Sequence, residues 1–397
     1  MTVRNGNTPI AMEQRVATNL SRRLFSIGLP KCNDGSERRF PITPEAAKLL
    51  VERGFVIRME GGAADVIHYT DGHYGRAGVD LCGRDEALRC DIVIHLAPMS
   101  VADIRKMRRG AMLLTLLQLH RQTAESVREL LARNVIAVAI DRIADSRGNT
   151  PIADILTEID GRAAIARAAS LLADADHGKG ILLGGVAGVI PCEVVVIGSG
   201  IAACAAARSA VGVGALVRMF DSDVYSLRRA ISELGANAVG ASLHPRGLRS
   251  ALRTADVVVS TSVNPPVTVD ADLVSEMKRG AIIFDLAEDC GKAFPSLPVT
   301  DLALSKPVDI SPTEPSRACY VNAGSLVPRT AAMAVSDALL TMFHEIVACE
   351  GITNALKLLP GLQRATYTFL GKAVDPDVAA IAGVRHVVDI NIYLTLS

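Results

Sequence analysis

The segment EVVVIGSGIAA, residues 193–203, constrains the fold of this chain more than any other feature. A β-branched run leads into a GxGxxA turn, and an alanine-rich helical pattern follows it. This order of strand, glycine turn and helix is typical of the first βα unit of a dinucleotide-binding domain. Gly198 permits the tight turn, Gly200 lets the backbone approach a pyrophosphate, and the small Ala203 lets helix and strand pack closely. A glycine turn kept for packing alone is the alternative interpretation.

An acidic residue, Asp221, ends the next predicted strand, 217–221. It follows the turn by about 20 residues, the spacing of a carboxylate that binds the ribose hydroxyls. Such a carboxylate accepts hydrogen bonds from a 2′-hydroxyl and repels a 2′-phosphate, which favours NAD over NADP. Arg218 and Arg228 lie nearby and oppose this preference. We therefore expect NAD as the cofactor.

Short apolar runs alternate with amphipathic stretches on both sides of this unit. Strands are predicted at 26–31, 56–61, 91–97, 111–119, 255–261 and 280–287, and long helices at 152–175 and 327–348. Nearly uninterrupted apolar strands between helices indicate parallel sheets that are buried on both faces. The predicted fold class is α/β, with doubly wound, Rossmann-like architecture.

Charge and composition exclude several classes of function. The 42 basic and 42 acidic residues balance, and there is no Trp, so neither electrostatics nor stacking favours a nucleic-acid partner. Eight scattered cysteines form no ligand-spaced cluster, so no metal is expected. No signal segment or uninterrupted span of about 20 apolar residues is apparent, which predicts a cytoplasmic protein without a membrane partner. The polar residues 1–24 are expected to form a flexible tail.

Several long motifs, in order along the chain, carry a resemblance to a known family. They are SERRFPITPEAAKLL (36–50), LTEIDGRAA (156–164), GKGILLGGVAGVIP (178–191), GAIIFDLAEDCGKAF (280–294) and YVNAGSLVPRT (320–330). The chain resembles the alanine dehydrogenase and nicotinamide nucleotide transhydrogenase α-subunit family, and alanine dehydrogenase more closely. The resemblance implies a discontinuous N-terminal substrate domain, 25–151 and 329–397, and an NAD-binding domain, 152–328. It also implies an active-site cleft between the two domains, and a homo-oligomer.

The resemblance also implies roles for four residues. Arg39 matches the arginine that holds the substrate carboxylate, a task suited to the planar guanidinium. Asn322 matches an asparagine near the nicotinamide and the substrate, and Thr157 a serine that contacts the cofactor. Asp289 matches an acidic residue beside the catalytic centre, where a carboxylate can accept a proton or orient water.

Two catalytic residues of the family are missing. Its lysine lies in a segment that here reads Ile94-His95-Leu96-Ala97-Pro98, where His95 is the only titratable side chain. Its histidine is replaced by Gln118, which can hydrogen-bond but cannot titrate. His120 follows two residues later and is expected on the same face of the predicted strand. Loss of a general acid–base group lowers rates by about 10²–10⁴-fold, so efficient turnover of alanine is not expected.

Two classes of function remain open. In the first, the protein is an NAD(H)-dependent oxidoreductase for a small amino or imino acid, with Asp289, His95 and Gln118 as catalytic residues. Reduction of a preformed imine needs less proton chemistry, so opine-type and cyclic-imine reductases belong here, beside a slow alanine dehydrogenase. In the second, the chain binds NAD(H) without catalysis, as a sensor, a regulatory subunit or a transhydrogenase-like protein.

Overall fold

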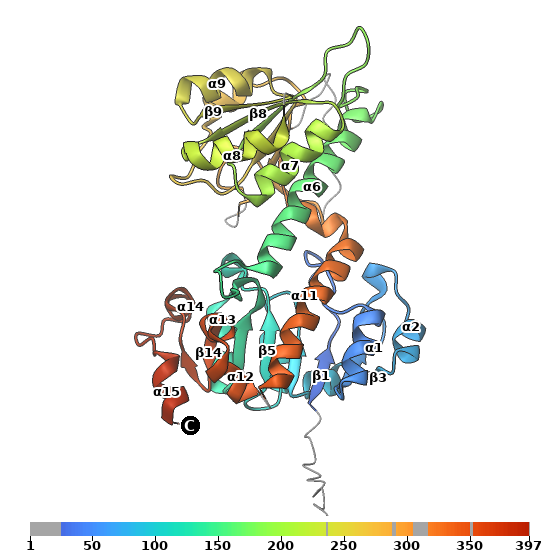
Figure 1. Cartoon of the computed structure of the whole chain (residues 1–397), viewed down its shortest axis with the longest axis vertical. Coiled ribbons are helices and arrows are strands. Elements are labelled where there is room, and N and C mark those ends of the chain that lie inside the picture. The colour runs from blue at the N-terminus through green and yellow to red at the C-terminus, as the bar shows by residue number, and fades with distance from the viewer. Residues whose placement is uncertain (1–24, 236, 288–290, 305–316, 350–351, 397) are drawn as a thin grey trace, which may run out of the picture.

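The computed structural model describes residues 25–235, 237–287, 291–304, 317–349 and 352–396. The predicted tail, 1–24, and Asp289 lie outside the described residues. The described chain forms two lobes, each built on its own sheet (Figure 1). The predicted α/β fold class, with two Rossmann-like lobes, is confirmed.

The first lobe holds an eight-stranded sheet of order β15-β14-β6-β5-β4-β1-β2-β3. Strands β1 to β6 pair in parallel, whereas β14 and β15 add antiparallel at the edge beside β6. The strands are β1 (Ser26–Leu29), β2 (Val56–Glu60), β3 (Asp80–Cys82), β4 (Ile92–Ile94), β5 (Met112–Thr115), β6 (Ile136–Ala139), β14 (Thr366–Phe369) and β15 (Lys372–Ala373). Because β14 and β15 come from the end of the chain, this lobe is made from two separate stretches of sequence.

Helices cover both faces of the first sheet. One apolar cluster packs α1 and α11 against it, and a second packs α4, α5 and α14 against the other face. The shorter helices of this lobe are α1 (Pro44–Glu52), α2 (Asp71–Arg76), α3 (Arg84–Leu88), α4 (Val101–Lys106), α5 (Ala124–Ala132), α12 (Ile352–Leu358), α13 (Pro360–Arg364), α14 (Pro376–Ala382) and α15 (Ile390–Leu396). Helix α1 begins with Pro44 in its first turn, and the Thr43 hydroxyl caps it by accepting from the Ala46 amide.

The second lobe holds a seven-stranded parallel sheet of order β12-β13-β11-β10-β7-β8-β9. Its strands are β7 (Glu193–Ile197), β8 (Leu216–Asp221), β9 (Ala238–Ser242), β10 (Val257–Ser260), β11 (Ile282–Asp285), β12 (Val299–Asp301) and β13 (Cys319–Val321). Its helices are α7 (Ile201–Gly212), α8 (Val224–Leu234), α9 (Pro245–Thr254) and α10 (Ala271–Glu276). The order reverses at β7, so the glycine turn lies at a topological switch point, where α/β sheets bind ligands.

Two long helices, α6 (Pro151–Ala173) and α11 (Pro328–Ala348), run between the lobes (Figure 1). In α6, Ile152 and Leu156 belong to the first core, whereas residues from Ala163 onward belong to the second. Since both helices pass from one lobe to the other, the boundaries expected near residues 151 and 329 stay predictions.

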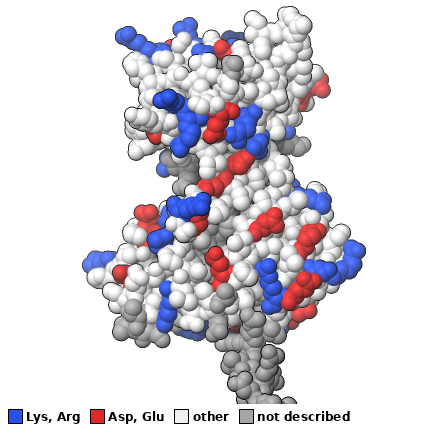
Figure 2. All heavy atoms as spheres, viewed as in Figure 1, with Lys and Arg blue, Asp and Glu red and all other residues white. Residues whose placement is uncertain are grey.

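Helix α11 is the one helix of the described residues with the length and apolar composition of a membrane span. Its Ala331, Ala332, Val335, Leu339 and Phe343 are fully buried in the first core, which accounts for that composition. Figure 2 shows basic and acidic side chains interspersed over one face of both lobes, without a large patch of one sign.

Candidate active site at the junction of the lobes

The glycine turn has the geometry that its sequence predicts. Gly198 adopts φ +113°, and a Cβ there would lie 2.0 Å from the Thr261 hydroxyl oxygen, so only glycine fits. Gly200 caps α7, and no heavy atom lies within 4 Å of the position that its Cβ would take. Ala203 is fully buried where α7 packs on the sheet. The turn therefore leaves open space at a helix N-terminus, which suits a pyrophosphate.

Asp221 lies beside this turn at the end of β8. Its carboxylate accepts a hydrogen bond from the Ser199 hydroxyl at 2.7 Å and from the Asp223 amide at 2.9 Å. Arg218, which opposes NAD in the sequence, instead donates to Glu193 at 2.7 Å, at the opposite end of β7 from Gly198. The residues present thus fit NAD, and the second lobe is an NAD-binding Rossmann domain.

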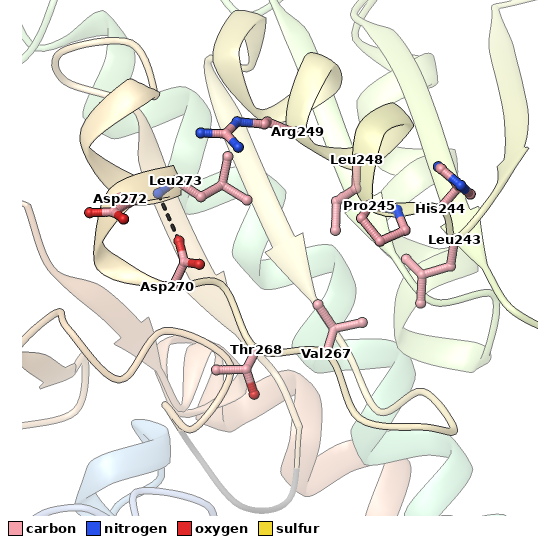
Figure 3. Close-up of a pocket in the computed structure, with 10 residues that line it drawn as sticks. All are labelled: Leu243, His244, Pro245, Leu248, Arg249, Val267, Thr268, Asp270, Asp272 and Leu273. Carbon is pink, nitrogen blue, oxygen red and sulfur yellow. Dashed lines mark hydrogen bonds between the residues drawn. The ribbon is translucent and has the colours of Figure 1, made fainter.

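A pocket of about 410 Å³ lies wholly within the second lobe (Figure 3). It is bounded by the loop after β9, by α9 and by the start of α10, and it borders the Asp221 strand because the Leu243 amide donates to the Asp221 carbonyl. Two of its charged groups have structural partners, since Asp270 caps α10 through the Leu273 amide and Arg249 pairs with Glu276, and Asp272 also lines it. The rest of the lining mixes apolar side chains, among them Leu243, Leu248 and Val267, with polar ones, including His244 and Thr268.

Arg39 lies in the loop after β1, and its closest partner is Glu37. The Arg39 Nε and Nη2 atoms donate to the two Glu37 carboxylate oxygens at 2.7 and 2.6 Å. The Glu37 side chain is 1% exposed and that of Arg39 11% exposed, so this is a buried ion pair. Burial opposes the charge on Arg39, yet Glu37, Asp160 and Asp141 together raise its pKa. Among the described residues, no hydrogen bond uses Arg39 Nη1.

Gln118 joins this pair from the loop after β5. Its Nε2 donates to Glu37 at 3.3 Å, and its Oε1 accepts from Arg121 at 2.7 Å. The strand expected over 111–119 is too long, because β5 ends at Thr115 and Gln118 takes a left-handed conformation before a 3₁₀ turn, η2 (Leu119–Arg121). His120 therefore lies in that turn, and the expectation that it shares a strand face with Gln118 is wrong.

Asn322 reaches the same loop from the second lobe. Its Nδ2 donates to the Ser36 carbonyl at 2.7 Å and to Asp301 at 3.0 Å. Asn322 has φ +62° and begins a 3₁₀ turn, η4 (Ala323–Leu326), whose Ser325 hydroxyl also donates to the Ser36 carbonyl. The structure thus brings Arg39, Gln118 and Asn322 together at the junction of the two lobes.

Helix α6 passes this junction. Thr157 is half-buried on it, and Asp160 follows three residues later, on the same helix face. The Asp160 carboxylate accepts from the Gly324 amide at 2.6 Å. Glu37 and Asp160 are the residues that the sequence reasoning missed. The position of Glu37 in the motif SERRFPITP, and the spacing of Asp160 from Thr157, are the signals that point to them.

His95 is placed differently. Ile92, Ile94 and Leu96 face one core and Val93 the other, so strand alternation places His95 on the Val93 face, towards α3 and α4. The ring is 6% exposed, its Nδ1 bonds the Ala97 carbonyl at 2.7 Å, and its Nε2 has no partner among the described residues. Burial lowers its pKa. No hydrogen bond links it to Arg39, Glu37 or Gln118, and its catalytic role stays a prediction, as does that of Asp289.

No group of three or more potential metal ligands occurs within the ranges that the structure describes. A Rossmann lobe whose glycine turn lies beside an acidic residue, joined to a second α/β lobe, defines the class of two-lobed NAD-binding proteins.

Comparison with known proteins places the chain within one family. Residues 28–159 match the N-terminal domain, and 164–376 the C-terminal domain, of the alanine dehydrogenase/PNT family. The chain belongs to this family.

The matches to individual relatives extend over nearly the whole length of both chains. An alanine dehydrogenase of Mycobacterium tuberculosis is 30% identical over 371 residues, 90% of this chain and 97% of the relative. One of Staphylococcus epidermidis is 27% identical over 364 residues, 89% and 96% of the two chains. A solved L-alanine dehydrogenase superposes with a TM-score of 0.79 at 25% identity, over 90% and 98%. A transhydrogenase from Sinorhizobium meliloti, at 20% identity, a TM-score of 0.71 and coverage of 88% and 99%, shares the fold.

Proposed function

We propose that this protein is an NAD(H)-dependent oxidoreductase that acts at the carbon–nitrogen centre of an amino or imino acid, and that it turns over alanine inefficiently. The observation that carries this proposal is Arg39. Its guanidinium is held rigidly by Glu37, its Nη1 is not used by the described residues, and it lies within the same loop as Ser36, which Asn322 contacts from the NAD-binding lobe.

The chain's own residues supply binding and orientation. Gly198, Gly200 and Asp221 would hold NAD, which supplies a hydride acceptor or donor when bound. The pocket beside Asp221, with Leu243, Leu248 and Val267 in its lining, suits the adenine ring. Arg39 Nη1 binds the substrate carboxylate. Asn322 and Gln118 position polar groups around it, Gln118 as a hydrogen-bonding residue that moves no proton.

The missing lysine and histidine favour reduction of a preformed imine over the deamination of alanine. In the segment where the family has its lysine, His95 is the only titratable side chain, and it is buried with a lowered pKa. Gln118 cannot titrate, so neither site supplies the proton transfers that formation and hydrolysis of an imine require. Reduction of an imine that arrives preformed avoids water attack. Opine-type and cyclic-imine substrates therefore suit this site better than alanine does.

A non-catalytic NAD(H)-binding protein, as a sensor or a regulatory or transhydrogenase-like subunit, is the second candidate. The observation that favours it is the bidentate hold of Glu37 on Arg39, since a guanidinium that is already neutralised attracts a second carboxylate less strongly. The two candidate functions differ in whether Arg39 Nη1 binds the carboxylate of a substrate.

The experiment follows NADH absorbance with a panel of keto acids, alone and with ammonia, amino acids or preformed cyclic imines. Turnover is expected with at least one imine. Arg39→Lys keeps the charge beside Glu37 but loses the planar fork, so KM for the acid should rise roughly 10–100-fold, with NADH affinity unchanged. The adjacent, exposed Arg38→Lys is the matched control. NADH binding without turnover on the whole panel supports the non-catalytic candidate instead.

A further inference from the structure

We infer that Asp160 binds the nitrogen of the substrate, opposite the Arg39 group that binds its carboxylate. This inference rests on the proposed function and deepens it, because it names the substrate class: an α-amino or α-imino acid recognised by both its charged ends.

The place of Asp160 is built by three elements. Its Oδ1 accepts from the Gly324 amide at 2.6 Å, and a Cβ on residue 324 would lie 2.3 Å from that oxygen, so a glycine is required where η4 meets the carboxylate. The same turn is tied to Ser36, next to Glu37, through Asn322 and Ser325. Asp160 and the Glu37–Arg39 pair thus flank one short turn.

Asp160 keeps one oxygen available. Its Oδ2 has no hydrogen bond among the described residues, and neither has Arg39 Nη1. An anionic oxygen and a cationic N–H group, one from the helix between the lobes and one from the loop after β1, complement the ammonium and carboxylate of an amino acid. Thr157, which matches a cofactor-contacting serine of the family, shares the face of α6 with Asp160, so the nitrogen end is expected near the bound cofactor.

The electrostatics suit a group that handles a proton. Burial raises the pKa of Asp160, although Arg39 and the Gly324 amide act to lower it. The charged groups on the elements around it are Arg39 and Glu37 in the loop after β1, Asp141 in the 3₁₀ turn η3 (Ile140–Arg142), Asp301 behind Asn322, and Arg329 at the start of α11. Arg39 and Glu37 are the two that act on Asp160 directly.

In imine reduction, protonated Asp160 gives its proton to the imine nitrogen while the imine carbon accepts the hydride from NADH. The C=N double bond becomes a C–N single bond, with one new C–H and one new N–H bond. The hydride, with its electron pair, would come from the reduced cofactor, which Gly198, Gly200 and Asp221 would hold. The Asp160 carboxylate then takes a proton from water. Asp160 thereby performs the acid–base task for which the family's lysine and histidine are missing here.

A structural role makes a different prediction. If Asp160 served only to accept the Gly324 hydrogen bond, the amide oxygen of asparagine would replace it without loss. Asp160→Asn keeps the shape and this bond but removes the charge and the proton. Glu158→Gln is the matched control, because Glu158 lies two residues away on the same helix and pairs only with Arg162 at the surface.

The experiment uses the full chain with bound NAD⁺ and measures, by calorimetry, the binding of the amino acid product identified in the panel and of the corresponding keto acid, which lacks nitrogen. Asp160→Asn should weaken binding of the amino acid roughly 10-fold or more and leave binding of the keto acid unchanged. Arg39→Lys should weaken binding of both ligands. In Asp160→Asn, kcat/KM for the imine should fall at least about 100-fold, and one inflection should disappear from the pH profile of kcat/KM. NADH affinity and Tm should match the wild type.

If Asp160→Asn binds both ligands as tightly as the wild type does, or if its pH profile is unchanged, this inference is overturned while the proposed function stands. A wild-type protein that binds NADH but neither turns over nor binds any acid of the panel would overturn both.

Discussion

The two halves of the junction differ in how far apart along the chain their residues lie. On the nucleotide side, Ser199 and Asp221 are 22 residues apart, and one βαβ unit, β7-α7-β8, sets their geometry. On the substrate side, Asn322 donates to a carbonyl 286 residues away, and Gln118 to a carboxylate 81 residues away. The first half is a local motif with a steric requirement, whereas the second depends on the docking of separate elements. Single substitutions should therefore have different effects on the two sides: they should leave buried charges unpaired on the substrate side and strain the backbone on the nucleotide side.

The largest effect is expected on the substrate side, where a buried charge pair is at stake. Arg39→Ala leaves the Glu37 carboxylate, 1% exposed, without its cation, which should lower the free energy of unfolding by about 3–5 kcal/mol. Urea unfolding of the purified chain measures this loss. Arg38→Ala, at an exposed neighbour, should cost almost nothing.

The double variant Glu37→Gln/Arg39→Ala sharpens this result, because it removes the stranded charge as well. Most of the lost stability should return, while the binding of acidic substrates stays impaired. If Arg39→Ala costs less than about 1 kcal/mol, the pair behaves as a surface salt bridge and the junction is more open to water than its burial indicates.

On the nucleotide side, Gly198→Ala tests the steric requirement. The φ of +113° and the approach to Thr261 should destabilise the protein by about 1–3 kcal/mol from backbone strain, before any clash, and abolish NADH binding. Gly200→Ala, where no atom lies within 4 Å, should keep Tm but weaken NADH binding, and Gly212→Ala at the end of α7 should change neither. Thermal unfolding and fluorescence titration with NADH separate the three. Equal Tm for Gly198→Ala and Gly212→Ala would contradict the steric account.

This contrast also explains what the sequence could predict. Gly198, Gly200, Ala203 and Asp221 were readable because one strand, one turn and one helix place them, and each residue type answers a geometric need. Arg39 and Asn322 were found through motif resemblance, since no local rule joins them. The Glu37 pairing and the approach of Asp160 to Gly324 depend on how α6 docks on both lobes, which no periodicity encodes. The strand expected up to residue 119 was too long because an apolar run continues past the point where β5 stops pairing at Thr115.

A smaller effect is expected at Asp221, which sets cofactor preference. Asp221→Ala removes the acceptor for the ribose hydroxyls and frees Ser199, so NADH affinity should fall roughly 10-fold or more. NADPH affinity should fall less or rise, since the repulsion of a 2′-phosphate is lost. Titration of wild type and variant with both cofactors checks this. Tighter binding of NADPH than of NADH by the wild type would contradict the role of Asp221.

The smallest effect is a pH dependence that separates His95 from the substrate half of the junction. Burial lowers the pKa of His95, so the folded protein keeps the ring neutral while the unfolded chain protonates it below about pH 6.5. As the pH falls below that value, the unfolded state takes up a proton that the folded state does not. The free energy of unfolding should then fall by about 1.4 kcal/mol per pH unit, until the pH reaches the folded pKa.

His95→Gln should remove this acid-side slope from urea unfolding measured between about pH 7 and pH 5, whereas His177→Gln, at a side chain that is 71% exposed, should keep it. The pH profile of kcat/KM should be the same in His95→Gln and wild type, because a ring that stays neutral donates no proton to the substrate. An inflection between about pH 5.5 and 8 that disappears in His95→Gln would instead make His95 the acid, and Asp160 would lose the task that the missing lysine and histidine leave open.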